Sequence, residues 1–199
     1  MNKKPFLYRI GVFLLGPIFK FYYNPKIIGA ENIPKDGPIL IVGNHIHLYD
    51  QCHALISTKR FITYMAKKEY FDSKKTAWFF KSVGCIPVDR SKKDEHAVES
   101  ALEVLKKGGA VGLFPEGTRN KTNLFLQPFK FGAVSMAKKT DAYLVPFGIT
   151  GEYKFRSKNL IVRFGKPFKV GDMELDEAND LLFKTVENLM KENLSENNQ

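Results

Sequence analysis

Short runs of apolar residues recur along this 199-residue chain, and they constrain its fold more than any other feature. The runs 39–42, 110–114 and 143–149 consist almost entirely of aliphatic and aromatic residues, without the alternating polar residues of a half-exposed strand. Such runs are typical of strands buried on both faces, as in parallel sheets covered by helices. We expect further strands or extended segments, the last of them at an edge of the sheet, in four other runs: 27–33, 61–65, 85–88 and 160–164.

Segments with helical spacing separate these runs. Between 95 and 107, apolar residues recur every three or four positions and stop at Gly108-Gly109, where a helix is expected to end. Residues 68–82 also favour a helix, Asp50 suits the start of another, and the acidic segment 175–189 has one apolar face. Strands that alternate with helices are typical of an α/β fold with a largely parallel sheet.

The length of the chain suits a single domain with a sizeable core. We expect one α/β domain over residues 27–199, with a mostly parallel central sheet flanked by helices and a motif-bearing core at 39–150. A membrane-association helix within residues 1–26 is expected to precede it. In sheets of this kind, sites gather in the loops beyond the carboxyl ends of the strands.

The N-terminal segment is apolar from Phe6 to Tyr23 and follows Lys3 and Lys4. Its longest uncharged run, residues 10–19, has about half the length that a membrane-spanning helix needs. No small-residue cleavage site of a signal peptide follows the run. Aromatic and basic residues at both ends favour a helix that lies in the membrane interface, with its lysines reaching anionic headgroups. The alternative is an ordinary core helix.

Charge is unevenly distributed along the chain. The formal net charge is +10, and residues 119–169 contain 11 Lys and Arg but only 2 acidic residues. A basic protein usually has an anionic partner, such as nucleic acid, an anionic membrane surface or a phosphorylated substrate, although a solvated lysine-rich surface explains part of the excess. No nucleic-acid-binding motif accompanies the charge, so we expect no such partner. The two cysteines, Cys52 and Cys85, form neither a disulfide framework nor a zinc spacing, and they suit a reducing cytosolic compartment.

Three of the four histidines, His45, His47 and His53, lie close to Asp50 in the sequence. A metal site is one interpretation, but the cluster has no cysteine and no second carboxylate, so we expect no metal. A His–Asp pair for acid–base chemistry is the other. Five residues on a helix correspond to a rotation of about 140°, so His45 and Asp50 meet only if the chain turns between them, as a strand-to-helix loop allows. His47 and His53, each three residues from Asp50, compete for the role, and spacing alone does not select the base.

A second polar segment, Phe114-Pro115-Glu116-Gly117-Thr118-Arg119, directly follows another expected strand. In this segment Gly117 frees the backbone, Thr118 offers a hydroxyl, and Arg119 provides a planar guanidinium suited to phosphate. Glu116 either fixes Arg119 or caps the loop. Two further cations are candidates for the same site, Arg90 and Lys130.

Together, four segments resemble the glycerolipid acyltransferase family, whose best-known members are the 1-acyl-sn-glycerol-3-phosphate acyltransferases. They occur in the family's order: Asn44-His45-x4-Asp50, Gly84 to Arg90, Phe114 to Arg119, and Val145 to Ile149. The resemblance covers residues 44–149, and the first and third segments at this separation are highly specific. Relatives with a two-helix N-terminal motif have more residues before the first core strand, so membrane attachment is expected to rest here on one helix together with the basic surface.

The resemblance implies a reaction that needs no cofactor. His45 is implied as the general base and Asp50 as the residue that orients its ring, so that an acceptor hydroxyl attacks the thioester of an acyl donor. The family pattern also implies an acceptor-phosphate site. Its candidate residues are Glu116, Gly117, Thr118 and Arg119, with Arg90 as a second phosphate ligand and Lys130 as a further cation.

We therefore predict an enzyme that transfers a fatty acyl group from acyl-CoA or acyl carrier protein to the sn-2 hydroxyl of 1-acyl-sn-glycerol 3-phosphate, or lysophosphatidate, giving phosphatidate. It is expected at the cytoplasmic face of the cell membrane, as a peripheral or monotopic protein on an anionic surface. One alternative is an acyltransferase for another lyso-lipid, such as a lyso-ornithine lipid. Another is a non-catalytic lipid-binding protein, against which an intact His45–Asp50 pair argues.

Overall fold

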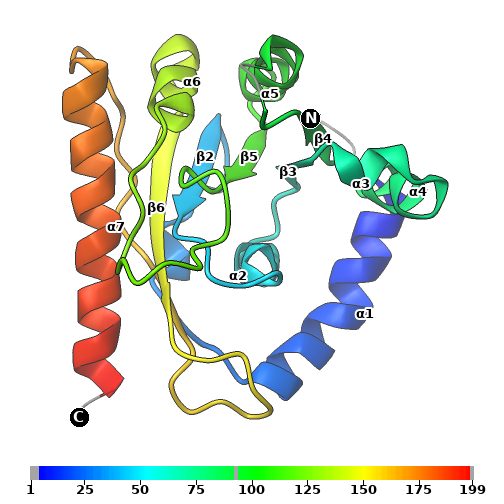
Figure 1. Ribbon diagram of the computed structural model, residues 1–199, viewed down its shortest axis with the longest axis vertical. Coiled ribbons are helices and arrows are strands. Elements are labelled where there is room, and N and C mark those ends of the chain that lie inside the picture. Colours follow the sequence, from blue (N-terminus) through cyan, green and yellow to red (C-terminus); the bar gives the residue numbers. More distant parts are fainter. Residues whose placement is uncertain (1–4, 92–93, 198–199) are drawn as a thin grey trace.

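The computed structural model describes residues 5–91 and 94–197, so Lys3 and Lys4, expected to reach anionic headgroups, lie outside the described residues. Seven strands form one sheet in the order β1-β7-β6-β2-β5-β3-β4 (Figure 1). Neighbouring strands are parallel except for β6 and β7, which confirms the expected α/β fold with a mostly parallel sheet. The strands are β1 (Lys26–Ile28), β2 (Ile39–Gly43), β3 (Ile62–Lys67), β4 (Ile86–Val88), β5 (Ala110–Leu113), β6 (Tyr143–Thr150) and β7 (Ile161–Phe164).

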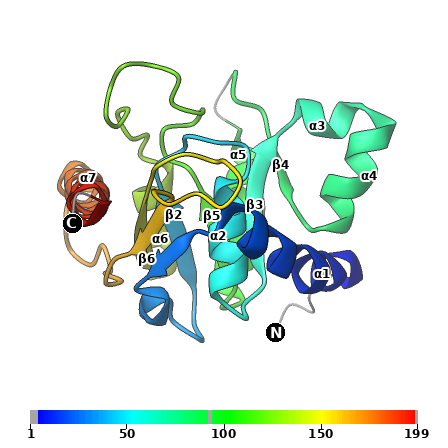
Figure 2. The same ribbon diagram turned by 90° about the horizontal axis from the view of Figure 1, so that it is seen from below.

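Helices cover both faces of the sheet. One face packs against α5, α6 and α7, and the other packs against α2, with α1 outside α2. Figures 1 and 2 show α7 and α1 at opposite sides of the molecule, with α3 and α4 beyond the β3–β4 edge. The helices are α1 (Phe6–Tyr23), α2 (Asp50–Ser57), α3 (Glu69–Asp72), α4 (Lys74–Ser82), α5 (Glu95–Lys106), α6 (Gly132–Thr140) and α7 (Leu175–Asn197), and a 3-10 turn η1 (Ala30–Asn32) follows β1.

The central strand β2 explains why both faces need helices. All of its residues are buried. Leu40 and Val42 belong to the hydrophobic cluster shared with α5, α6 and α7, whereas Ile39 and Ile41 belong to the cluster on the α2 side. Successive side chains of a strand point to opposite faces, so a strand with two dry faces has no position for a polar residue.

The segment expected as an edge strand is an inner strand. β7 lies between β1 and β6, and the edges of the sheet are β1 and β4. The expectation was wrong because the order of strands depends on pairing between distant segments of the chain, and β1, with only three residues, none of them buried, covers the outer edge of β7. Its residues nevertheless pair in parallel register with β7, from Lys26 opposite Ile161 to Ile28 opposite Arg163.

Two helical segments also differ from expectation. The segment 68–82 contains two helices, because the extended backbone of Ser73 (φ −86°, ψ 126°) separates α3 from α4. Helix α6 was not expected. Two of its four buried residues are alanines, Ala133 and Ala137, so its apolar face is a weak signal in the sequence.

Helix α1 lies within the expected membrane-association segment, and it is no ordinary core helix. Of its 18 residues, only Tyr8 and Gly16 are buried. Its large apolar side chains mostly face solvent, with Phe6 74% and Phe13 77% exposed. Within the described part of the chain, no helix combines the length and the apolar character needed to cross a membrane.

Gly43 ends β2 at the point where the chain passes very close to its neighbour β6. Gly43 and Phe147 are partners in the parallel ladder. A Cβ atom on Gly43 would lie only 2.4 Å from the carbonyl oxygen of Phe147 and 2.4 Å from Cε2 of its ring. Since Phe147 is itself buried between the sheet and α2, neither group has space to move away.

We predict that Gly43→Ala lowers the free energy of unfolding by about 1–3 kcal/mol, the usual penalty for overfilling a packed core. The measurement is urea unfolding followed by circular dichroism, with a lower midpoint and an unchanged m-value. Gly132→Ala is the control, because Gly132 begins α6 with open space around it and an added methyl group there should favour the helix. Equal stabilities of the two variants would contradict this account of Gly43.

Candidate active site

Three loops meet at one end of the sheet. β2 lies between its parallel neighbours β5 and β6, so the carboxyl ends of all three strands point to the same edge. The loop after β2 contains His45, the loop after β5 contains Glu116, and the loop after β6 contains Tyr153 (Figure 1). The first two loops hold sequence motifs that follow expected strands, and the structure brings both motifs to one edge. The third carries no motif.

Asn44 fixes the start of the first loop. Its side-chain amide donates a hydrogen bond to the carbonyl of Ile149 (2.9 Å), and its amide oxygen accepts one from the Ile149 N–H (2.7 Å). The buried side chain thus gives β6 a hydrogen-bonding partner just beyond the end of β2. As a result, the residue before His45 has a fixed position relative to β6.

The carboxylate of Asp50 is the centre of the site. Its Oδ2 accepts hydrogen bonds from Nδ1 of His45 (2.7 Å) and from the backbone N–H groups of Ile46 (2.7 Å) and His47 (2.8 Å). Its Oδ1 accepts a hydrogen bond from the hydroxyl of Tyr153 (2.5 Å). The side chain is fully buried, at 0% exposure, and it opens α2, where the helix dipole also favours negative charge. Four donors therefore compensate for the loss of water around this carboxylate.

His45 is held so that one ring nitrogen stays available. Its Nδ1–H donates to Asp50, so in the neutral ring Nε2 carries the lone pair. The ring stacks on Phe114, with centroids 4.0 Å apart and planes 10° apart. The side chain is 13% exposed, which leaves an opening to solvent. The arrangement suits a general base whose acceptor atom is Nε2.

The loop after β5 holds the backbone of His45 from both sides. The Glu116 carboxylate accepts the His45 N–H (2.6 Å) and the Gln127 N–H (3.2 Å), and the Asn120 N–H donates to the His45 carbonyl (2.7 Å). Burial raises the pKa of Glu116, and the two N–H donors oppose that rise. From the sequence, Glu116 was expected either to fix Arg119 or to cap the loop. Its bonds to two backbone N–H groups give it the second role.

Gly117 and Lys130 lie together next to Glu116. Gly117 has a φ of +74°, a left-handed conformation that glycine adopts without strain. A Cβ atom there would lie 3.0 Å from both Cε and Nζ of Lys130, so the lysine side chain passes directly over this turn. The backbone of Lys130 is fixed as well, since its N–H donates to the carbonyl of Pro115 (2.9 Å).

The remaining candidates for phosphate binding are Thr118, Arg119 and Arg90. Thr118 is exposed and Arg119 is partly buried, and both precede Asn120, whose backbone is bonded to His45. Arg90 is exposed after the edge strand β4, and β3 separates β4 from β5. The structure therefore brings Thr118 and Arg119 to the His45 loop and places Arg90 farther along the same edge.

Tyr153 is the functional candidate that the sequence did not indicate. Because its hydroxyl donates to Asp50, its oxygen accepts a hydrogen bond from Nε2–H of His53 (2.8 Å). Burial lowers the pKa of His53 to about 4, so this ring is neutral at pH 7. The ring of His47 instead stacks on Tyr153, with centroids 4.1 Å apart, and only its backbone N–H reaches Asp50. Of the three clustered histidines, His45 is thus the one whose ring is bonded to Asp50.

The last turns of α1 form the wall behind this network. The ring of Phe19 meets the ring of His53 edge-on at 5.3 Å, and Tyr23 meets Tyr153 edge-on at 5.5 Å. The N–H of Arg156, in the Tyr153 loop, donates to the carbonyl of Tyr22 (2.6 Å). The N-terminal helix therefore contacts the residues that support Asp50.

Neither cysteine is suited to act as a nucleophile in this site. Burial raises the pKa of both Cys52 and Cys85 to about 11, so their thiols stay protonated and poorly nucleophilic at neutral pH. Within residues 5–91 and 94–197, no three His, Cys, Asp or Glu side chains are grouped to hold a metal ion.

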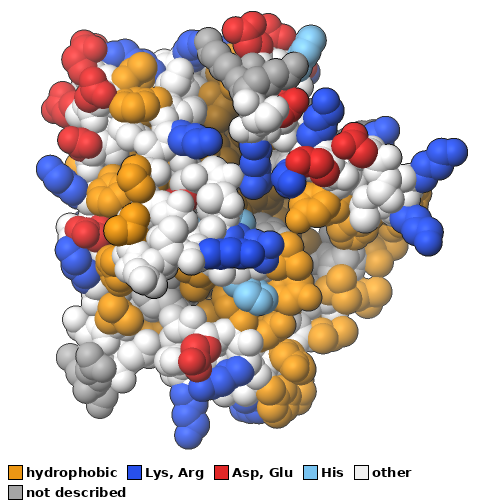
Figure 3. Space-filling model, in the orientation of Figure 1, with side chains coloured by type: hydrophobic (Ala, Val, Ile, Leu, Met, Phe, Trp, Pro, Cys, Tyr) orange, Lys and Arg blue, Asp and Glu red, His pale blue; other side chains and the backbone are white. Residues whose placement is uncertain are grey.

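The surface over the site combines two kinds of side chain. Figure 3 shows Lys and Arg side chains and a histidine near the centre of this face, with hydrophobic side chains next to them on the side where α1 lies. Such a surface suits a substrate with an anionic head and an apolar tail.

Comparisons with known proteins show the sequences and the fold to which this chain is similar. The family model described as Acyltransferase matches residues 24–150. The 1-acyl-sn-glycerol-3-phosphate acyltransferase of Bacillus subtilis is 32% identical over 74% of this chain and 75% of its own length. A chloroplastic enzyme of the same name from Brassica napus, BAT2, is 33% identical over 67% of this chain, but the match spans only 39% of the plant protein. The crystal structure of the 1-acyl-sn-glycerophosphate acyltransferase PlsC from Thermotoga maritima matches 96% of this chain and 83% of its own with a TM-score of 0.72 and 23% identity, so it shares the fold.

We predict that buried His53 makes the fold sensitive to acid. The unfolded chain takes up a proton near pH 6.5, whereas folded His53 resists protonation down to about pH 4. Stability should be fully present above pH 6.5 and decrease as the pH falls towards 4, by an amount on the order of 3 kcal/mol. Urea unfolding across this range measures the loss.

His53→Gln keeps a side-chain N–H for Tyr153 and should flatten this pH dependence. His96→Gln removes a fully exposed histidine and should leave the dependence as in the native chain. If both variants show the same slope of stability against pH, His53 is not the responsible group.

Proposed function

The chain belongs to the acyltransferase family whose model matches residues 24–150, and on that premise we propose that it is a 1-acylglycerol-3-phosphate O-acyltransferase. It transfers a fatty acyl group from acyl-CoA or acyl carrier protein to the sn-2 hydroxyl of lysophosphatidate and forms phosphatidate, a step of phospholipid biosynthesis. Relatives from Bacillus subtilis and Streptococcus pneumoniae are named for this reaction. No cofactor takes part, because the substrates contain both reacting groups.

The single observation that carries the proposal is the bond between Nδ1 of His45 and the buried carboxylate of Asp50 (2.7 Å). A protein that only binds lipid has no use for a histidine oriented in this way. The acceptor substrate supplies its own hydroxyl as the nucleophile, so no protein serine or cysteine is required.

The proposed reaction begins when Nε2 of His45 accepts the proton of the acceptor hydroxyl. At the same time the hydroxyl oxygen forms a bond to the thioester carbonyl carbon. The tetrahedral intermediate then collapses and its carbon–sulfur bond breaks. The proton on His45 passes to the leaving thiolate, which restores the neutral ring. Asp50 holds the Nδ1–H throughout and stabilises the imidazolium form, while its other three donors keep its own position fixed.

We propose that the acceptor phosphate lies over the loop after β5. Arg119 is the main ligand, because a guanidinium donates two parallel hydrogen bonds to phosphate oxygens. Lys130 adds a charge above the Gly117 turn, and Thr118 adds an exposed hydroxyl. Arg90, farther along the same edge of the sheet, suits a contact with a more distant anionic group of either substrate. Glu116 contributes by holding His45 and this loop together.

We also propose that α1 attaches the protein to the cytoplasmic face of an anionic membrane, lying in the interface as in a peripheral or monotopic protein. The exposed apolar face of α1 supports this, together with Trp78, which is 62% exposed on α4, a helix that contacts α1. Phe155 extends the same surface, because it packs edge-on against Phe21 and Tyr22. A lysophospholipid in that membrane reaches the site without passing through water.

We predict that His45→Gln lowers the rate of acyl transfer by about 10²–10⁴, because the general base is lost while the loop keeps its backbone bonds. The assay follows phosphatidate formation from lysophosphatidate with each acyl donor. His47→Gln is the matched control and should keep activity within about tenfold, since its contact with Asp50 is made by the backbone. Full activity of His45→Gln would reject the mechanism.

We predict that Arg119→Ala raises KM for lysophosphatidate by about ten- to a hundredfold, the usual effect of losing a hydrogen bond to a charged group. KM for the acyl donor should change little. Lys166→Ala, an exposed cation after β7, is the control and should leave both values unchanged. The same assay with a panel of lyso-lipids includes a lyso-ornithine lipid, which lacks the phosphate. If the enzyme prefers the lyso-ornithine lipid, that lipid and not lysophosphatidate is the acceptor.

We predict that Phe13→Asp weakens binding to phosphatidylcholine vesicles by at least about tenfold, because burying a phenylalanine contributes about 2 kcal/mol. Leu181→Asp introduces the same charge on α7, at the other side of the molecule, and should bind like the native chain. Trp78 is the only tryptophan, so quenching of its fluorescence by brominated acyl chains reports contact of α4 with the bilayer. Equal binding by both variants would show that α1 is not the anchor.

A further inference from the structure

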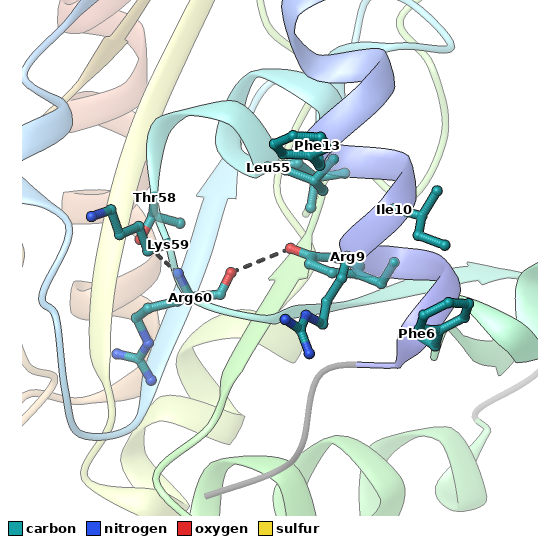
Figure 4. Close-up of a pocket in the computed structure, with 10 residues that line it drawn as sticks. Phe6, Arg9, Ile10, Phe13, Leu55, Thr58, Lys59 and Arg60 are labelled. Atoms are coloured by element: carbon teal, nitrogen blue, oxygen red, sulfur yellow. Dashed lines mark hydrogen bonds between the residues drawn. The ribbon is translucent and has the colours of Figure 1, made fainter.

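A groove lies between α1 and the turn that joins α2 to β3. Its volume is about 570 Å³, within the usual range of ligand pockets. In Figure 4, Phe6 and Ile10 lie on the α1 side, Lys59 and Arg60 lie on the opposite side, and Arg9 reaches from α1 into the space between them. The groove therefore has one apolar side and one cationic side.

The groove and the His45 site lie at opposite ends of α2. Asp50 begins this helix at the carboxyl edge of the sheet, and Thr58, which directly follows its last residue, lines the groove. Eight residues of helix separate the two ends by about 12 Å. Arg60 lies just before β3, at the amino end of that strand. A molecule in the groove therefore does not occupy the acceptor position at His45.

Arg9 lies at the border between two faces of α1. It is seven residues from Gly16, which is buried against Ile56, and four residues from Phe13, which is exposed. Residues that are four or seven positions apart on a helix point in nearly the same direction. Arg9 therefore lies between the face packed on the protein and the exposed apolar face. In a helix that lies in the membrane interface, this border is at the level of the lipid headgroups.

The described lining of the groove contains three cations, Arg9, Lys59 and Arg60, and no carboxylate. The Arg60 guanidinium is fixed by the carbonyls of Pro34 (3.1 Å), Gly37 (2.6 Å) and Gly108 (2.9 Å). Asp36 is the acidic group that acts on it, through space. A positive charge held by carbonyl dipoles keeps its attraction for an anion nearby.

We propose that this groove binds one anionic phospholipid, with Arg9 as the ligand of the headgroup phosphate and Arg60 as a second, supporting positive charge. Phe13, Ile10 and Leu55 then contact the glycerol and the first part of an acyl chain. The exposed apolar wall favours a lipid over a soluble phosphate, and the excess of cations favours an anionic over a zwitterionic headgroup. This inference rests on the proposed attachment of α1 to a membrane, and it specifies the lipid that the attachment selects.

The experiment compares binding to vesicles of phosphatidylcholine alone with binding to vesicles of equal parts phosphatidylcholine and phosphatidylglycerol. Arg9→Gln should lose at least about tenfold of the preference for phosphatidylglycerol, because a charged hydrogen bond is removed. Lys20→Gln is the matched control, since Lys20 is an exposed cation on the same side of α1, outside the groove. Lys20→Gln should lower the preference for phosphatidylglycerol only by the general electrostatic effect of one charge, about fivefold. Arg9→Lys should restore part of the preference.

Native mass spectrometry of the full chain from detergent micelles with added phosphatidylglycerol tests the same site without a bilayer. One retained lipid is expected for the native chain and for Arg119→Ala, and its loss is expected for Arg9→Gln. Equal losses of preference in Arg9→Gln and Lys20→Gln, or a lipid retained by Arg9→Gln, would overturn the proposed groove site. Failure of the native chain to bind phosphatidylcholine vesicles would instead overturn the membrane attachment.

Discussion

The buried carboxylate of Asp50 is the interaction on which the rest of the site depends. Two parts of the chain that are about a hundred residues apart in the sequence, the loop after β2 and the loop after β6, both donate hydrogen bonds to it. An unpaired carboxylate in that position would be strongly unfavourable, so the fold is stable only when these parts are assembled. The same requirement orients the ring of His45, and the stability of the fold and the geometry of the base therefore have one cause.

Topology explains why so few residues suffice to build the site. Because β2 has a parallel neighbour on each side, the loop that follows it is enclosed by the loops that follow β5 and β6. One of these holds the backbone of His45 through Glu116 and Asn120, and the other supports Asp50 through Tyr153. Each contact fixes a different degree of freedom, since the first sets where the ring is attached and the second sets where it points.

The sequence predicted those features that depend on local composition. The apolar composition of Ile39 to Val42 predicted a strand buried on both faces, and the structure has it. The expected strand-to-helix loop also lets His45 and Asp50 meet. Features that depend on partners distant in the chain were missed. Tyr153 reaches Asp50 only because β6 ends beside β2, and the inner position of β7 depends on pairing with a three-residue strand. The choice of His45 over His47 also needed information beyond spacing, either the family resemblance or the observed stacking of His47 on Tyr153.

The inner and outer sides of helix α1 are constrained to different degrees. Phe19 and Tyr23, on its inner side, pack against His53 and Tyr153, where a change of ring size or angle is transmitted to Asp50 through two or three contacts. On its outer side most large apolar side chains are exposed, and there one apolar residue of moderate size can replace another. Exchanges of one apolar residue for another along this helix should therefore be tolerated with a helical period, freely on the outer positions and hardly at all on the inner ones. A stretch of sequence that resembles a simple anchor thus carries, on one of its faces, part of the information that specifies the reaction centre.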